Sequence, residues 1–173
     1  MEKKEIEKLT SFLFEIGTLR KIIRMHQQAL LVSDPSDNIA SHTFRTVVIG
    51  YFLAKEMDAD ADKVIKMCLL HDIEETRCGD QNWVHKRYVK VFEEEIRKGQ
   101  LEDLPHSEEF LNLSKEYQER KTLAAKIAKD ADRLDELFLL REYKLQGNKE
   151  ASRWLREENE NEKRLFTGFA RQV

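Results

Sequence analysis

Hydrophobic side chains recur at helical spacing along the first fifty residues of the chain. Residues 2–26 are predicted to form one or two amphipathic helices, interrupted near Gly17, with apolar positions at Ile6, Leu9, Phe12, Leu13 and Ile16. The polar run over residues 33–38 is the clearest loop in the sequence. Residues 40–57 that follow are apolar on more than one face, which is typical of a buried central helix.

A second series of helical patterns fills the rest of the chain. Asp60 is a candidate N-cap for an apolar helix that runs into His71-Asp72 and ends before Gly79. Further helical patterns cover residues 83–98, with Gly99 as the stop, begin at Ser107, and run over residues 121–146. The pattern therefore predicts an all-α protein.

Composition supports a compact multi-helix bundle. The 173 residues include only 6 Gly and 2 Pro, too few for the many tight turns of an all-β fold. No linker or repeat divides the chain, so we predict one domain over residues 1–173. The cysteines, Cys68 and Cys78, form no metal-binding or disulfide pattern.

Charge and hydropathy indicate which binding partners and which cellular compartment to expect. The formal net charge of −3 gives no basic footprint, so extended nucleic acid is not expected as a partner. No apolar run reaches membrane-spanning length, and the N-terminal residues MEKKEIEKL are charged from the start, unlike a signal peptide. These features predict a cytoplasmic protein that does not bind membranes.

Four residues have the types and the helical context of one metal site. They are His42 near the start of the central helix, the adjacent His71 and Asp72 at the end of an apolar helix, and Asp130 in a later helix. Two imidazoles and two carboxylates balance a divalent charge and leave positions for water and substrate. Mixed nitrogen and oxygen ligands favour one divalent ion of Mn, Co, Ni, Fe or Zn over Mg.

The order and spacing of these four residues resemble the H…HD…D pattern of the HD-domain superfamily of metal-dependent phosphohydrolases. The stretch from His71 to Asp80 is similar to the H-D-x-x-E-x-x-x-G-D signature of its 5′-deoxynucleotidase branch. The sequences around Arg24 and Asp130 resemble that branch too. The resemblance implies an HD-domain helical bundle, a metal-dependent phosphoric monoester hydrolase and a homodimer. The charged C-terminal helices could mediate the dimer or simply cover the core.

The same resemblance gives three further residues a role. Glu75 follows His71 by four positions, and would orient the attacking water or accept its proton. Asp80 would contact the sugar or donate a proton to the leaving oxygen. Arg24 is the preferred phosphate ligand because a guanidinium binds two phosphate oxygens at once, with Arg20 as the competing candidate.

The function predicted from the sequence is hydrolysis of (deoxy)ribonucleoside 5′-monophosphates to nucleoside and phosphate. Met25 stands where the branch often carries a tryptophan, so the choice between deoxyribose and ribose stays open. The alternatives are an HD phosphohydrolase acting on a cyclic nucleotide or a triphosphate, and a regulatory module that binds metal without turnover.

Overall fold

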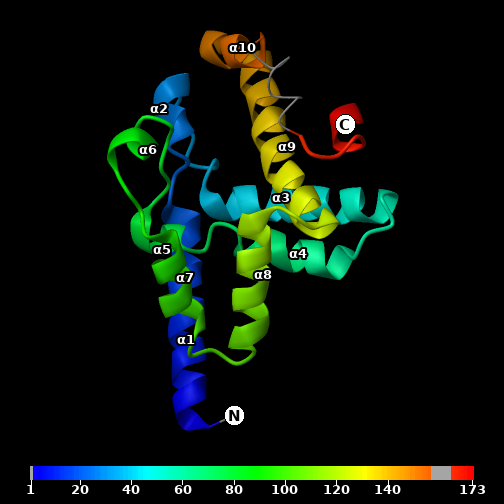
Figure 1. Ribbon diagram of the computed structural model, residues 1–173. Coiled ribbons are helices and arrows are strands. Elements are labelled where there is room, and N and C mark those ends of the chain that lie inside the picture. Colours follow the sequence, from blue (N-terminus) through cyan, green and yellow to red (C-terminus); the bar gives the residue numbers. More distant parts are fainter. Residues whose placement is uncertain (1, 157–164) are drawn as a thin grey trace.

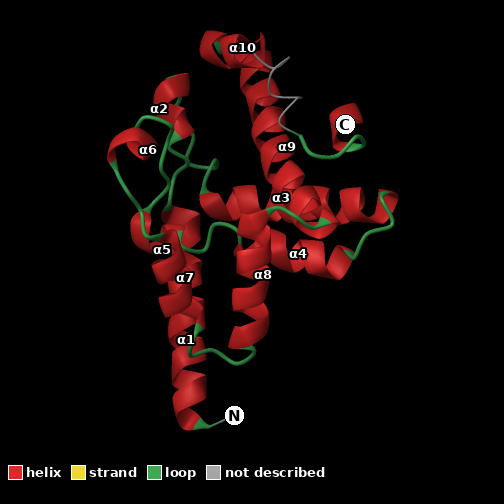
Figure 2. Cartoon of the chain, in the orientation of Figure 1, coloured by secondary structure: helices red, strands yellow, loops and turns green. Residues whose placement is uncertain are grey.

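The computed structural model describes residues 2–156 and 165–173, and the structured parts of these segments are helical (Figures 1 and 2). The predicted fold class is confirmed. The helices are α1 (Lys3–Ile16), η1 (Gly17–Lys21), α2 (His26–Leu30), α3 (Ile39–Glu56), α4 (Ala61–Leu70), α5 (Glu75–Cys78), α6 (His85–Tyr88), α7 (Glu93–Leu101), α8 (Ser107–Glu119), α9 (Leu123–Leu145), α10 (Lys149–Arg156) and η4 (Ala170–Gln172). Within the described residues, no helix is both long and apolar enough to cross a bilayer.

Three helices form the centre of the molecule. Figure 1 shows α3 and α4 crossing one end of the long helix α9. Their shared core holds the buried side chains of Leu53, Val64, Met67 and Ile127, together with several alanines of α9. Burying such side chains contributes about 1.5–3 kcal/mol each, so this core fixes the relative positions of the three helices.

Gly50 lets α3 and α4 approach closely. A Cβ atom placed there would lie 2.9 Å from Sγ of Cys68 and 3.1 Å from Cγ1 of Val64. Both contacts are closer than ordinary van der Waals distance, so only a residue without a side chain fits between the two helices.

Helices α1, α7 and α8 lie below the central helices in Figure 1. A smaller core of Ile73, Leu101 and Leu104, with Phe12 and Ile16 of α1 against it, joins this part to the segment after α4. At the opposite end, α10 packs on α9 and α2 around Leu30 and Tyr143. Helix α10 therefore covers this end of α9, while residues 157–164 of the charged C-terminal stretch lie outside the described residues.

Most predicted helix boundaries are confirmed. The first helix ends at Ile16, Asp60 caps α4 by accepting a hydrogen bond from the Lys63 amide, and α8 begins at Ser107. Three predictions were wrong. The apolar helix does not run on to Gly79, because α4 ends at Leu70 and a turn over residues 71–74 separates it from α5. Residues 83–98 are not one helix, because the non-helical segment Val89–Phe92 separates α6 from α7. Gly99 does not stop α7, which continues to Leu101.

Candidate metal centre

The predicted pair of histidines meets at the crossing of α3 with the end of α4. His42 is on the first turns of α3, and His71 follows the last residue of α4. Their Nε2 atoms lie 3.0 Å apart, and both side chains are buried. Asp72 completes a cluster with them, because its Oδ2 is 3.0 Å from Nε2 of His71 and 3.5 Å from Nε2 of His42.

Hydrogen bonds on the far side of each ring direct the Nε2 atoms toward the cluster. His71 donates from Nδ1 to the carbonyl oxygen of Cys68 at 2.7 Å, and His42 shares its Nδ1 with Asp135 at 2.5 Å. A neutral imidazole that donates from Nδ1 has its lone pair on Nε2. Two lone pairs facing each other across 3.0 Å repel unless a cation lies between them.

The spacing of the donor atoms fits such a cation. Two ligands at about 2.1 Å from one metal ion and at right angles to each other lie ~3 Å apart. The cluster also requires positive charge. Burial and Arg24 lower the pKa of His42, but Asp132, Asp135 and Asp72 outweigh them and raise it well above its usual range. A proton or a metal ion satisfies this requirement, and the nitrogen and oxygen donors suit a transition metal.

The fourth residue of the cluster is Asp132, and the structure corrects the placement predicted for Asp130. Oδ1 of Asp132 lies 3.2 Å from Nε2 of His42 and 3.8 Å from Nε2 of His71. Asp130 is fully buried elsewhere, where its two oxygens accept hydrogen bonds from the backbone amides of Phe166 and Thr167, both at 2.8 Å. Residues two apart on a helix point about 200° from each other, so only one of the two can face the histidines.

Sequence reasoning also missed Asp135 and Lys129, the neighbours of Asp132 on the same side of α9. Asp135 is 2% exposed and binds His42, while its Oδ1 accepts a 2.5 Å hydrogen bond from Nε of Arg45. Lys129 forms a 2.5 Å ion pair with Asp132. The spacing of three residues along α9 was the signal available, since residues three apart share a helix face.

The predicted phosphate ligand, Arg24, lies beside the cluster but not on a helix. It sits in the short segment between η1 and α2. Its backbone amide donates a 3.1 Å hydrogen bond to the carbonyl oxygen of Asp37, which lies two residues before α3. Its Nη1 is 3.6 Å from Oδ2 of Asp135, and this buried nitrogen has no hydrogen-bond partner among the described residues. Burial lowers the pKa of Arg24, but the neighbouring carboxylates, led by Asp72, raise it above its usual value. The competing candidate, Arg20, is exposed.

Asp80 secures the segment that carries Arg24. Its Oδ2 accepts a 2.6 Å hydrogen bond from the backbone amide of Met25 and lies 4.0 Å from Nε of Arg24. The left-handed backbone of Gly79, with φ of 70°, turns the chain between α5 and Asp80. The structure therefore brings Asp80 and Arg24 together from parts of the chain that are far apart in sequence.

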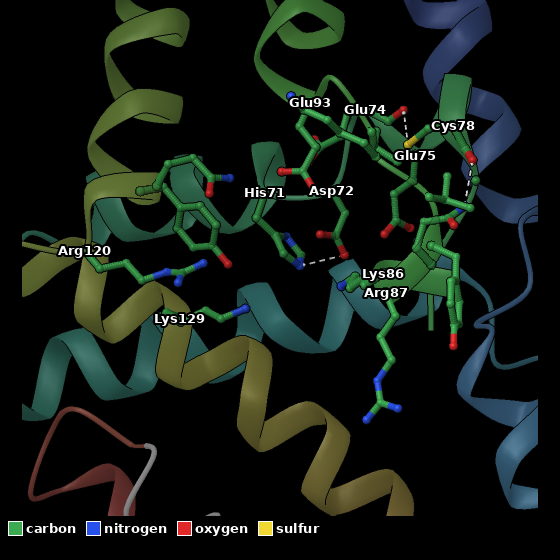
Figure 3. Close-up of a pocket in the computed structure, with 18 residues that line it drawn as sticks. His71, Asp72, Glu74, Glu75, Cys78, Lys86, Arg87, Glu93, Arg120 and Lys129 are labelled. Atoms are coloured by element: carbon green, nitrogen blue, oxygen red, sulfur yellow. Dashed lines mark hydrogen bonds and ion pairs between the residues drawn. The ribbon is translucent and has the colours of Figure 1, made fainter. Parts of the chain in front are cut away.

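Glu75 lines a cavity of about 500 Å³ that opens beside His71 and Asp72 (Figure 3). Its Oε2 is buried and has no hydrogen-bond partner among the described residues. Burial, reinforced by the charges of Asp72 and Asp80, raises the pKa of Glu75 to about 10. At neutral pH a carboxyl group with this pKa is protonated, and positive charge bound at the cluster would lower the pKa toward the range that a general base needs. Its neighbour Glu74 is buried and paired with Arg97 at 2.6 Å.

Comparison with known proteins agrees with this geometry. A family model described as an HD domain matches residues 16–172. The chain belongs to the HD-domain family. It is 26% identical over 123 residues to a 5′-deoxynucleotidase HDDC2 of Dictyostelium discoideum, and the match spans 64% of this chain and 64% of that protein's length.

Solved structures extend the likeness of this HD-domain protein over nearly the whole chain. A conserved hypothetical protein of Pyrococcus furiosus superposes with a TM-score of 0.77 at 26% identity, covering 93% of both chains. A predicted metal-dependent phosphohydrolase of Magnetospirillum magnetotacticum superposes with a TM-score of 0.61 at 27% identity, covering 79% of this chain and 70% of the other. The family predicted from the H…HD…D pattern is thereby confirmed.

Proposed function

We propose that this HD-domain metal-dependent phosphohydrolase hydrolyses nucleoside 5′-monophosphates, releasing nucleoside and inorganic phosphate. The observation that carries the proposal is Arg24, whose buried Nη1 lacks a hydrogen-bond partner among the described residues and lies beside the histidine–carboxylate cluster. Leaving a buried charged donor unsatisfied is costly, so this nitrogen is expected to bind an anion. A phosphate group is the anion that a guanidinium binds with two parallel hydrogen bonds. The similarity to the 5′-deoxynucleotidase HDDC2 of Dictyostelium supports the same substrate class.

The ligand set that we propose is His42, His71, Asp72 and Asp132. A divalent metal bound by these side chains would polarise a phosphate oxygen and lower the pKa of a water molecule. Asp135 would hold the ring of His42 in the tautomer that presents its Nε2 lone pair to the cluster.

The remaining residues act directly on the substrate or position those that do. Arg24 would neutralise the phosphate charge, and Glu75 would orient the attacking water and accept its proton, with its carboxyl group facing the cavity. Asp80 would position Arg24 through the amide of Met25 and hold the sugar side with its remaining oxygen. Arg24 and Glu75 each have a buried polar atom without a hydrogen-bond partner among the described residues, and Asp80 links its own loop to the segment that carries Arg24.

A substrate screen tests the proposal. Metal-free protein is loaded in turn with Mn, Co, Ni, Fe, Zn and Mg, and phosphate release is measured from monophosphates, triphosphates and cyclic nucleotides. We expect release from monophosphates, with loss of at least ~1000-fold in Asp72→Ala, because a metal ligand is removed. Asp62→Ala is the matched control, since its side chain on α4 is 82% exposed. Undiminished release by Asp72→Ala, or release only from another nucleotide class, would refute the assignment.

The sugar preference is tested by comparing dAMP with AMP. Met25 donates its backbone amide to Asp80, so its side chain lies next to the residue proposed at the sugar. We expect a preference for the deoxyribonucleotide, as in the branch that the sequence resembles. Equal kcat/KM values for dAMP and AMP would show that this position does not select the sugar.

We further propose that the protein is a cytoplasmic homodimer. The support is a row of exposed apolar side chains on one side of α3, namely Phe44, Val48, Tyr51 and Phe52. Apolar patches of this kind on an otherwise charged surface mark interaction sites. Light scattering coupled to size-exclusion chromatography is expected to give twice the chain mass of 20.5 kDa, reduced to one chain by Phe44→Glu. A monomeric wild-type protein would exclude the dimer.

A further inference from the structure

The cavity beside the cluster has a cationic lining that does not include the phosphate ligand Arg24. Its volume is about 500 Å³, and Arg24 is not among the described residues that line it. Five basic side chains do line it: Lys86, Arg87, Lys90, Arg120 and Lys129. The same lining holds the carboxyl groups of Asp72, Glu74, Glu75 and Glu93. Lys129 is paired with Asp132, whereas the other four cations form no ion pair among the described residues.

Aromatic contacts account for two of the five cations. The guanidinium of Arg87 stacks on Trp83, 4.7 Å from the ring centroid, and Figure 3 shows it turned away from His71. The ammonium of Lys90 lies 5.2 Å from the centroid of the Phe92 ring. Cation–π contacts of this kind already hold both side chains in place. In Figure 3, Arg120 and Lys129 both point toward His71.

Arg120 occupies a backbone position where glycine is preferred. It is the C-cap of α8, with φ of 53° and ψ of 29° in the left-handed region. Helices commonly end in this conformation with glycine, because a Cβ atom there is strained. Residues kept in such conformations cluster at functional sites.

One nitrogen of the Arg120 side chain also lacks a partner. Its Nε is buried and has no hydrogen-bond partner among the described residues. A buried guanidinium nitrogen without a partner is costly, and an arginine at a glycine-favouring position adds a second cost. An anion bound to this guanidinium would compensate for both costs.

Lys129 joins the lining of this cavity to the metal cluster. Its ammonium group is 2.5 Å from Oδ2 of Asp132, while Oδ1 of the same carboxylate faces His42. Asp132 therefore bridges the proposed metal and Lys129. An anion bound by Arg120 and Lys129 would lie beside the first phosphate.

We infer that Arg120 and Lys129 form a second anion subsite that takes a phosphoryl group in addition to the one bound at the metal. The group is either a further phosphate of the same nucleotide or the free phosphate released by the reaction. This inference rests on the proposed function for the identity of the first phosphate. It names no new chemical step, only an additional binding site for a phosphate dianion.

Calorimetric titration of Mn-loaded protein with pyrophosphate and with inorganic phosphate tests the subsite without turnover of a nucleotide. We expect the wild type to bind pyrophosphate at least ~10-fold more tightly than phosphate, and Arg120→Gln to lose this difference. Lys121→Gln is the matched control, because Lys121 is the next residue and its side chain is 78% exposed. An undiminished preference in Arg120→Gln, or an equal loss of affinity for both probes, would overturn the subsite.

A glycine variant separates binding from folding. Arg120→Gly relieves the left-handed strain, so we expect no loss in Tm together with the same loss of pyrophosphate preference. A clear fall in Tm would assign Arg120 a structural role and overturn the inference. Phosphate release from dADP and dAMP then identifies the source of the second phosphate. A KM for dADP that rises only in the Arg120 variants indicates a nucleotide phosphate, whereas weaker product inhibition alone indicates free phosphate.

The outcome is distinguishable from failure of the proposed function. If the wild type releases phosphate from no monophosphate, the proposed function fails, while the pyrophosphate titration still decides the subsite. If monophosphates are hydrolysed and Arg120→Gln binds pyrophosphate like the wild type, the proposed function stands and the subsite fails.

Discussion

Alanine variants of Asp130 and Asp132 are expected to have opposite effects on stability and on metal binding. The two residues lie two positions apart on α9, and their carboxylates point to different parts of the molecule. Asp130→Ala leaves the backbone amides of Phe166 and Thr167 without their acceptor. Asp132→Ala removes an oxygen that lies 3.2 Å from Nε2 of His42.

The magnitude for Asp130 follows from its two hydrogen bonds, both 2.8 Å long and made to a fully buried carboxylate. Hydrogen bonds to a charged group are worth about 1.5–3 kcal/mol each. The desolvation of the buried carboxylate offsets part of this sum, so the net loss is roughly 2–4 kcal/mol. In a protein of this size, that loss lowers Tm by roughly 4–16 °C.

Thermal unfolding in EDTA and the bound metal content are the two measurements. We expect Asp130→Ala to lose the stability calculated above while still binding one metal ion per chain. Asp132→Ala should lose metal and activity, with a smaller change in metal-free Tm because its removal leaves no buried backbone amide without an acceptor. The assignment is refuted if Asp130→Ala loses metal at unchanged Tm, or if Asp132→Ala keeps a full complement of metal.

Three further predictions concern the residues around the cluster. Asp135→Asn should weaken metal binding about 10–100-fold, measured by competition with a chelating dye, because an amide no longer holds His42 by a charged hydrogen bond. Arg24→Gln should raise KM for the nucleotide at least ~10-fold with metal content unchanged, and an unchanged KM would exclude Arg24 as the phosphate ligand. The hydrogen bond from Arg77 outweighs the effect of burial and lowers the pKa of Glu15 from 4.5 to about 2. The ionised Glu15 carboxylate therefore contributes fully to stability above pH 4.5, and this contribution is lost as the pH falls toward 2. Glu15→Gln should therefore be less stable than wild type in urea at pH 7, with a difference that shrinks between pH 4.5 and 2.

The helices of this fold are largely predictable because local rules govern them. The pattern of apolar residues located α3, α4 and α9, and the cap at Asp60 marked the start of α4. The prediction of one helix over residues 83–98 was wrong because one long helix and two short helices have a similar hydrophobic pattern. The conformation of Val89–Phe92 depends on packing against the rest of the molecule, which a local pattern does not contain.

The site was predictable as a set of residue types and less so as a set of positions. His42, His71 and Asp72 are brought together as expected, since each is fixed by the end or the beginning of a helix. The choice between Asp130 and Asp132 depends on the rotation of α9, because both lie in the same turn of sequence. The acceptor role of Asp130 requires residues 166 and 167, which are distant in sequence and carry no local signal.

The roles of Asp80 and Arg120 were inaccessible for different reasons. Asp80 was expected at the substrate, yet its clearest contact is to the backbone of Met25 across 55 positions of sequence. Arg120 sits in a charged stretch that reads as helix surface. Only its left-handed backbone and its buried Nε distinguish it from the other arginines.

The close approach of α3 and α4 at Gly50 influences the spacing of the metal ligands from a position remote from the metal. Gly50 is two helical turns beyond His42 on α3, about 12 Å along the axis, and it faces Cys68 three residues before His71. The distance between α3 and α4 at this contact therefore affects the distance between the two imidazoles. That distance in turn sets the radius of the ion that both can bind. A methyl group at Gly50 would push the two helices apart. We therefore expect Gly50→Ala to change the preference among metal ions although every ligand is retained.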